Sequence, residues 1–330
     1  MSHIHRFALH AGGILLAAAT LGAGMTMSLP ALAATAQAKS AHHDMKGMST
    51  YPMTVKDDTG RTIVLKKQPV RIVSLTLGTD EVLTSMIPAK DLVGIDYYST
   101  VPTYSHIVSL VAREHLHVIG SASGSINAEE VIAQRPDLVL AADYTNPKVV
   151  AQLEAAGIPV YEFTTFNSFA AIESHILTLG KIVNEQAKAA TMVAHIRAQL
   201  TALRATQPKT KLTVLYYSFG YVAGAETTGN DVIRYAGGIN AAAKFTGWPA
   251  VSAEQVVKLN PDVIVIPDDS GAQDAELKSF LANPAFKHLK AVLDHHVYTA
   301  PDGNLSDVAQ FFPLGVADVQ HMLDEALHTK

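Results

Sequence analysis

The sequence predicts an α/β protein of two similar lobes, and the main evidence is a segment that occurs twice. Residues 126–141 and 251–266 share one pattern: a polar residue, a short helical stretch, an Arg-Pro or Asn-Pro pair and an apolar run. Apolar, partly β-branched runs of this length are typical of buried parallel strands. A helix leading into a buried strand, once in each half of the chain, indicates two α/β lobes.

The boundaries of the two duplicated helices follow from local rules. Each begins at an N-cap residue, Asn127 or Ser252, with an acid or amide three positions later, which is the spacing of a capping box. The residue before a proline is disfavoured in the helical region. We therefore expect the two helices to end at Arg135 and Asn260.

The other elements are predicted in chain order. In the first half we expect a β-hairpin over 53–64, a strand over 71–75, a helix from Asp80, a strand over 92–95, a helix to Ala156 ended by Gly157, and a strand over 158–163. In the second half we expect a strand over 212–217, a helix ended by Gly237-Gly238, a strand over 296–299 and a terminal helix from near Asp307.

The stretch between Ser168 and Gln207 has no strand pattern. Its apolar residues recur at helical spacing and predict two helices in series, with a break at Asn184. The predicted organisation is therefore an N-terminal lobe over 53–166, a helical connector over 167–208 and a C-terminal lobe over 209–330. A connector of this kind resists bending, so the lobes should move little relative to each other.

The amino-terminal residues predict export. A basic start, an apolar stretch over 11–29 and Pro30-Ala31-Leu32-Ala33 form a signal-peptide layout, with cleavage expected after Ala33. An uncleaved anchor is the alternative. Residues 34–52 form a polar leader whose His42–Met48 segment is either plain linker or a soft-metal ligand set. The chain has no cysteine, which excludes disulfides, thiolate chemistry and a lipidated cysteine, and so favours a periplasm.

Charge and matched acidic residues limit the choice of partner. A net charge of −5 without a basic stripe argues against nucleic acid. Glu129 and Glu254 occupy equivalent positions in the first turns of the duplicated helices. Each carboxylate either stabilises its helix through the macrodipole or forms one of a pair of anchors for a partner with two basic sockets.

The ordered motifs resemble a known family, the substrate-binding proteins of bacterial ABC importers for ferric siderophores, haem and cobalamin. They are Arg71-Ile-Val-Ser-Leu, Val93-Gly94-Ile95, Ala128-Glu129, Pro136-Asp137-Leu138-Val139, Gly157-Ile158-Pro159-Val160, Gly237-Gly238-Ile239-Asn240, Ser252-Ala253-Glu254 and Pro261-Asp262-Val263-Ile264. The resemblance implies two Rossmann-like lobes joined by a long helical connector, a ligand cleft between the lobes, and a monomer without cofactor or catalysis. It also implies that Glu129 and Glu254 dock on arginines of an inner-membrane permease.

Loops after the strands supply the candidate ligand contacts. They are Thr76, Thr79, Tyr97, Tyr98, Tyr144, Phe166, Tyr217, Phe219, Trp248, Asp268 and Asp302. Aromatic walls suit a large planar or macrocyclic ligand. Tyr97 and Tyr98 are adjacent in a segment expected to be extended, so at most one should face the cleft. The resemblance to cobalamin-binding members places Trp248 at the cleft, and that to haem-binding members makes Tyr98 or Tyr97 a candidate axial ligand.

Two alternatives from other classes remain. An exported hydrolase would need a nucleophile and a base, and no G-x-S-x-G, H-E-x-x-H or phosphate-binding loop occurs in the sequence. A free-metal-ion binder would need three or four converging His, Asp or Glu side chains. No arginine falls on the candidate loops, which disfavours a strongly anionic chelate.

Overall fold

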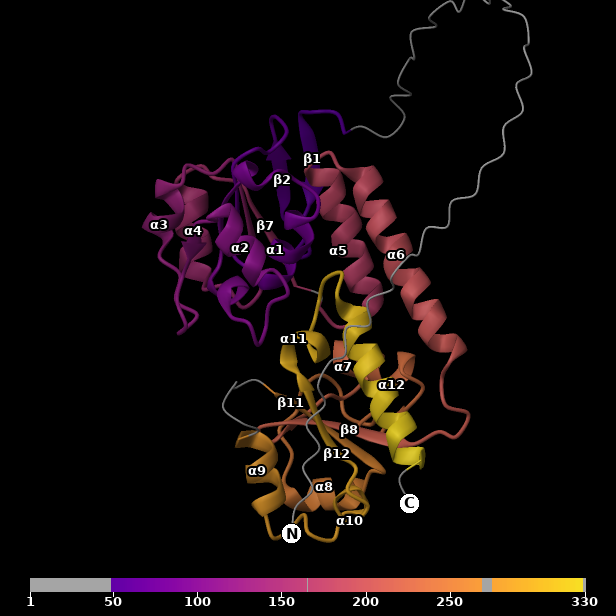
Figure 1. The fold of residues 1–330 in the computed structure, drawn as a ribbon. Coiled ribbons are helices and arrows are strands. Elements are labelled where there is room, and N and C mark those ends of the chain that lie inside the picture. The colour runs from indigo at the N-terminus through magenta and orange to yellow at the C-terminus, as the bar shows by residue number, and fades with distance from the viewer. Residues whose placement is uncertain (1–48, 165, 269–274, 329–330) are drawn as a thin grey trace, which may run out of the picture. The chain divides into compact units, whose positions relative to one another are not determined.

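The computed structural model describes residues 49–164, 166–268 and 275–328, and it confirms the predicted α/β class (Figure 1). Two five-stranded sheets carry the fold, with strand orders β5-β4-β3-β6-β7 and β10-β8-β11-β12, where β9 pairs with β8. All the pairs along these two orders are parallel, and among the described strands of these two sheets only β9 is antiparallel to its neighbour, β8. The predicted signal peptide and residues 34–48 of the predicted leader, including His42–Met48, lie outside the described residues.

The first sheet forms the N-terminal lobe, which the hairpin of β1 (Met53–Lys56) and β2 (Thr62–Leu65) precedes. Its strands are β3 (Ile72–Ser74), β4 (Leu92–Asp96), β5 (Val118–Ile119), β6 (Leu138–Ala142) and β7 (Val160–Phe163). Its helices are α1 (Leu77–Thr84), η1 (Ala89–Asp91), η2 (Tyr97–Thr100), α2 (Val108–Glu114), α3 (Ala128–Ala133) and α4 (Pro147–Ala155).

The second sheet forms the C-terminal lobe. Its strands are β8 (Thr213–Ser218), β9 (Tyr221–Val222), β10 (Ile239–Asn240), β11 (Val263–Asp268) and β12 (Val297–Pro301). Its helices are α7 (Thr228–Tyr235), α8 (Ala253–Leu259), α9 (Ala275–Ala282), α10 (Lys290–Leu293), α11 (Asp302–Leu305) and α12 (Phe312–His328).

Each sheet is covered on both faces, because alternate residues of its buried strands point to opposite sides. In the N-terminal lobe, Val73 and Val139 pack with α3 and α4, whereas Ile72 and Leu138 belong to the cluster that includes α1 and α5. The C-terminal sheet is arranged likewise, with α8, α9 and α10 on one face and α7 and α12 on the other. This two-sided covering explains why the strands read as unbroken apolar runs.

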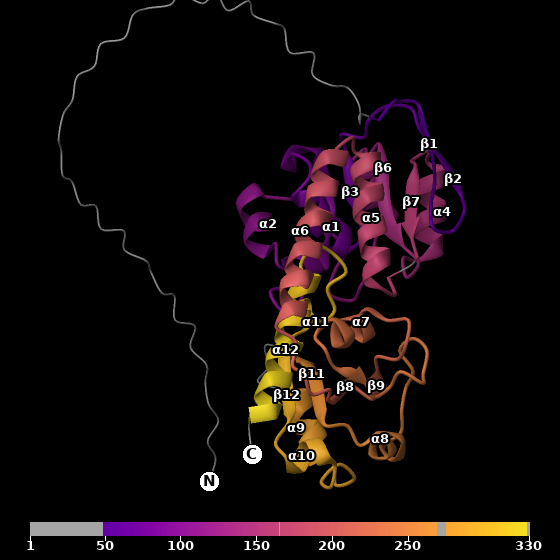
Figure 2. The same cartoon turned by 90° about the vertical axis from the view of Figure 1, so that its right-hand side faces the viewer.

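The connector contains the two successive helices that were predicted, with the break at Asn184, and they fold back on each other as a hairpin. α5 (Phe169–Ile182) and α6 (Gln186–Ala205) lie side by side in both views (Figures 1 and 2), and left-handed Asn184 makes the turn. The end of α6 continues to the C-terminal lobe, where α12 packs against it. Glycine 180 allows this packing, since a Cβ there would lie 2.3 Å from that of Ala189.

Most predicted helix boundaries are confirmed, but α1 begins at Leu77 and not at Asp80, and the start of the terminal helix also differs. Arg135 and Asn260 precede their prolines in the left-handed region, at φ 50° and 39°, so the duplicated helices end there as expected. Ser252 makes the full capping box with Gln255. The terminal helix begins at Phe312 rather than near Asp307, because a loop of inter-lobe contacts intervenes.

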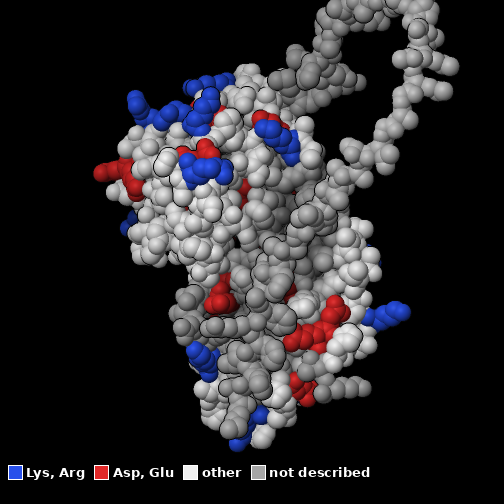
Figure 3. Space-filling view, viewed as in Figure 1, with Lys and Arg blue, Asp and Glu red and all other residues white. Residues whose placement is uncertain are grey.

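Figure 3 shows acidic and basic side chains scattered over one face, with no continuous basic stripe on the part that is visible. In the described part of the chain, no helix has the length and apolar character needed to cross a membrane.

Candidate functional site

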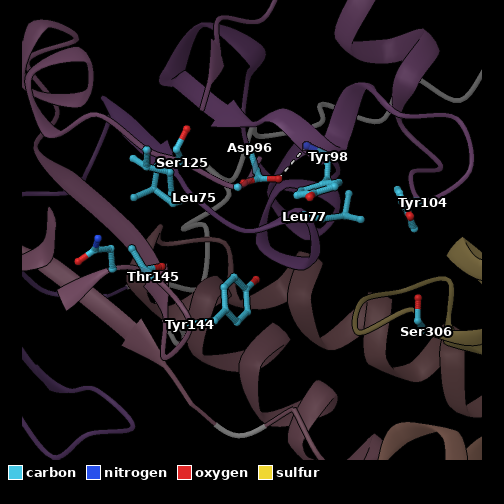
Figure 4. Close-up of a pocket in the computed structure, with 12 residues that line it drawn as sticks. Leu75, Leu77, Asp96, Tyr98, Tyr104, Ser125, Tyr144, Thr145 and Ser306 are labelled. Atoms are coloured by element: carbon cyan, nitrogen blue, oxygen red, sulfur yellow. Dashed lines mark hydrogen bonds between the residues drawn. The ribbon is translucent and has the colours of Figure 1, made fainter. Parts of the chain in front are cut away.

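A cavity of about 560 Å³ lies at the carboxyl ends of β3, β4 and β6, where parallel-sheet proteins bind their ligands (Figure 4). Most of its wall comes from the N-terminal lobe, and one residue, Ser306, comes from the C-terminal lobe. The lining residues are Leu75, Leu77, Asp96, Tyr98, Tyr104, Gly124, Ser125, Ile126, Tyr144, Thr145, Asn146 and Ser306. The volume falls in the range of small-molecule sites.

Three tyrosines give the cavity its aromatic surface. Tyr98 and Tyr104 meet edge to face, with ring centroids 5.6 Å apart, and the Tyr98 hydroxyl donates a long hydrogen bond of 3.4 Å to the Ala122 carbonyl. Tyr144 is 70% exposed, and its ring projects into the cavity from the loop after β6 (Figure 4). An exposed ring of this kind has its face available for a ligand.

Asp96 is the only acidic or basic side chain among the described residues that line the cavity. One of its oxygens accepts from the Tyr98 backbone nitrogen at 2.8 Å and thereby caps η2. Behind it, fully buried Asp80 accepts from the Asp96 backbone nitrogen at 2.8 Å and from the Ser99 hydroxyl at 2.6 Å. Burial raises the pKa of Asp96 to about 6, although the Tyr98 hydrogen bond lowers it.

The predicted contacts of the N-terminal lobe fall into three environments. Tyr98 and Tyr144 come together in the cavity. Thr76 and Thr79 are buried; Thr76 caps α1 by accepting from the Thr79 backbone nitrogen, and the two hydroxyls are hydrogen-bonded to each other. Tyr97 packs edge-on against Tyr98 outside the lining residues. The segment is a 3₁₀ turn and not extended, because the Asp96 cap starts η2.

Phe166, the remaining N-terminal candidate, packs edge-on against His175 of α5, with ring centroids 5.1 Å apart. It is not among the residues that line the cavity.

The predicted contacts of the C-terminal lobe are not brought into this cavity. Tyr217 and Phe219 line a separate depression of about 380 Å³ beside α9, where Tyr217 packs on Phe280. Trp248 is 43% exposed and meets buried Tyr216 edge-on at 5.1 Å. Asp268 ends β11, and Asp302 begins α11.

The paired glutamates occupy equivalent, exposed positions. Glu129 follows the Asn127 cap of α3 by two residues, and Glu254 follows the Ser252 cap of α8 by two residues. Neither carboxylate forms an ion pair with another described residue. Both are therefore accessible to a partner.

Sequence reasoning missed several lining residues. Asp96 and Asn146 follow predicted strands, so the rule that selected Tyr98 and Tyr144 could have found them. Tyr104, Ser125 and Ser306 carry no such signal. Within the described ranges, no three His, Cys, Asp or Glu side chains are grouped so that they could hold a metal ion.

The two-lobed fold and the cavity at the strand ends define a ligand-binding protein of the doubly wound α/β class. Residues 72–303 match the family of periplasmic binding proteins, and the chain belongs to this family.

Individual relatives bind different ligands. A cobalamin-binding protein of Halobacterium salinarum is 29% identical over 266 residues, which cover 78% of this chain and 70% of that protein. The structure of an ABC-type Fe3+-hydroxamate transport system from Saccharomonospora viridis has a TM-score of 0.70 at 22% identity, covering 83% of this chain and 99% of that one. The periplasmic haem-binding protein RhuT of Roseiflexus sp. RS-1 has a TM-score of 0.66 at 24% identity, covering 78% and 98%. At these identities the two structures show a shared fold.

Proposed function

We propose that the protein is the exported substrate-binding component of an ABC importer and that its ligand is a large metal chelate, for which a corrinoid is the favoured class. The observation that carries the proposal is the tyrosine-lined cavity at the strand ends, in a chain of the periplasmic binding protein family. The protein captures and delivers its ligand and catalyses nothing. Among the residues that the structure describes, no comparable feature supports a free-metal-ion binder or a hydrolase.

The charge of the cavity favours a chelate without carboxylates. None of the described lining residues is Lys or Arg, and Asp96 adds a carboxylate. A ligand with anionic groups would leave these groups unpaired in a confined space, which costs binding free energy. Corrinoids carry carboxamide side chains, whose N–H groups can donate to Asp96 and to tyrosine oxygens. The corrin face can stack on an exposed ring such as that of Tyr144, which adds about 0.5–1.5 kcal/mol.

A complete cobalamin is larger than the cavity, so part of it would lie outside. Trp248, Tyr217, Phe219, Asp268 and Asp302 remain candidate contacts for that part. Haem is the second candidate ligand, with Tyr98 as the axial ligand, because a tyrosine oxygen can ligate ferric haem. Its carboxylates, however, would find no cationic partner among the described lining residues.

Delivery would use Glu129 and Glu254 as one anchor per lobe. Their exposure and their equivalent places in the duplicated units support this role, since charged pairs at an interface align two proteins. The proposed permease lies in the inner membrane, and the binding protein acts as a soluble periplasmic monomer after cleavage at Ala33, without a lipid anchor.

The test is a titration of the purified protein with cyanocobalamin, haem and a ferric hydroxamate, followed by calorimetry and by the fluorescence of the single tryptophan, Trp248. We expect heat and quenching with cyanocobalamin at a stoichiometry of one. If the protein binds haem more tightly than cyanocobalamin, and if Tyr98→Phe abolishes the absorbance change that haem binding produces, then haem and not a corrinoid is the ligand. No binding of any of the three would overturn the proposal.

A further inference from the structure

The two lobes contact each other directly through α11, which follows β12, and through the loop between α11 and α12. The Gly303 backbone nitrogen donates to the Thr103 carbonyl at 2.9 Å, and His106 Nε2 donates to the Gly303 carbonyl at 3.1 Å. Gln310 Nε2 donates to the Glu81 carbonyl at 2.7 Å. These bonds join segments that are about two hundred residues apart in the sequence.

The contact is close enough to require glycine. A Cβ on Gly303 would lie 2.6 Å from the Tyr104 carbonyl oxygen, and a Cβ on Gly78 would lie 2.7 Å from a methyl carbon of Val308. Such separations are well inside van der Waals contact. The two lobes are therefore packed backbone to backbone along this loop.

At the centre of the contact, two buried carboxyl groups are hydrogen-bonded to each other. Glu81 of α1 is 1% exposed and Asp307 is 6% exposed, and their side chains are paired. A carboxylate only accepts hydrogen bonds, so one of the two groups must carry a proton. Burial, and then the negative charge of Asp307, raise the pKa of Glu81 to about 10, and burial raises the pKa of Asp307 as well, so the pair retains a proton in the folded protein.

The other oxygens of the pair are satisfied by neighbouring backbone. Glu81 Oε1 accepts from the His106 nitrogen at 2.9 Å, and Asp307 Oδ1 accepts from the Ala309 nitrogen at 2.9 Å. The titratable groups that face the pair are Asp80, one residue before Glu81, and His106. Asp318 of α12 interacts electrostatically with both His106 and His321.

We propose that Glu81 and Asp307 are positioning residues: one proton shared between them fixes the C-terminal loop that carries Ser306 against the N-terminal wall that carries Tyr104. Ser306 precedes Asp307 in the chain, and Tyr104 lies two residues before His106, so the pair holds two lining residues of the cavity in place. The consequence for ligand affinity rests on the proposed function, whereas the shared proton and the lobe contact do not.

The shared proton is tested by the pH dependence of unfolding. The ordinary pKa of Glu81 is 4.5, so between this value and about 10 the folded protein holds a proton that the unfolded chain has released. Relative to Glu81→Gln, the unfolding constant of the natural protein should therefore rise about tenfold more for each unit of pH. Glu162→Gln is the matched control, because Glu162 is a carboxyl with a raised pKa whose ion pair is with Arg61 of the N-terminal lobe, and its slope should be that of the natural protein. Equal slopes in Glu81→Gln and the natural protein would refute the shared proton.

The positioning role is tested by measuring the distance between the lobes. The chain has no cysteine, so spin labels on Lys148→Cys and Lys258→Cys, at exposed sites of α4 and α8, report one inter-lobe distance. The distribution of distances between the two labels should stay narrow in Glu81→Gln, because the Gln amide can still donate to Asp307. In Glu81→Ala this distribution should broaden or shift. Glu81→Asp has a side chain that is one methylene too short to reach Asp307, so its distance distribution should resemble that of Glu81→Ala. It replaces Glu81→Ala in this test if Glu81→Ala does not fold. Unchanged distributions in these variants would overturn the role.

Ligand binding separates this inference from the proposed function. Affinity for the probe that binds, cyanocobalamin or haem, should fall about tenfold in Glu81→Ala and stay within about twofold in Glu81→Gln. If the natural protein binds none of cyanocobalamin, haem and the ferric hydroxamate, the proposed function is wrong, while the unfolding slopes and the distances between the labels still decide about the pair.

Discussion

Asp96 accepts a hydrogen bond from the backbone nitrogen of Tyr98 at 2.8 Å, and both side chains line the same cavity. The bond caps η2 and turns the chain so that the Tyr98 ring faces the cavity while Tyr97 packs beside it. One carboxylate oxygen of Asp96 therefore has the structural role of capping η2. The other is the acceptor that we assign to the ligand.

Replacing Asp96 with Asn should make ligand affinity independent of pH near neutrality. Because the pKa of Asp96 is raised to about 6, its carboxylate is ionised above that pH and accepts most strongly there. Affinity of the natural protein for cyanocobalamin should fall about tenfold from about pH 7 to about pH 5, and calorimetry measures this. Asp143→Asn, at an exposed carboxyl beside Tyr144, is the control. If the affinity of Asp96→Asn for cyanocobalamin still depends on pH as in the natural protein, Asp96 does not contact the ligand directly.

Replacing Gly303 with Ala should both destabilise the protein and weaken ligand binding. The new Cβ meets the Tyr104 carbonyl, so the loop must move away from the N-terminal lobe. We expect a loss of about 1–3 kcal/mol in unfolding free energy, measured by denaturant titration. Ser306→Ala, three residues later at an exposed position, should change stability by less than about 0.5 kcal/mol. If Gly303→Ala is as stable as the natural protein, the contact is looser than the structure indicates.

Changes at Glu129 and Glu254 should affect uptake and not ligand affinity. Substitution with Gln removes the charge and keeps the size, at a folding cost of a few tenths to about 1 kcal/mol. Uptake of labelled ligand by cells should fall for each single change and nearly vanish for the double change. Lys should be worse than Gln because it repels the arginines expected on the permease. Normal uptake with both Lys variants would leave only the helix-dipole explanation.

The free and loaded protein should have nearly equal radii of gyration in solution scattering. α6 runs from the N-terminal lobe to helices of the C-terminal lobe, and the loop around Gly303 adds direct hydrogen bonds between the lobes. A hinge would have to break these contacts. Marked compaction on adding ligand would contradict this expectation.

Features that depend on neighbours in the chain were predictable from the sequence. Asn127 and Ser252 cap their helices as expected, because a cap bonds to nitrogens only two or three residues away. The buried strands β6 and β11 were recognised because strands covered on both faces need apolar residues throughout. Tyr98 and Tyr144 both line the cavity, as expected because parallel strands bring their following loops to one edge.

The tertiary structure alone decided which distant residues meet. Nothing in the sequence near Glu81 indicates Asp307, and nothing near Tyr104 indicates that Ser306 completes the same cavity. The two successive helices of the connector were predicted, but their packing against each other as a hairpin was not. Periodicity reports that a helix has an apolar face but not which surface covers that face. That choice depends on packing across the whole chain, and so the sequence alone determined the elements and their caps, whereas the tertiary structure determined the cavity and the contact between the lobes.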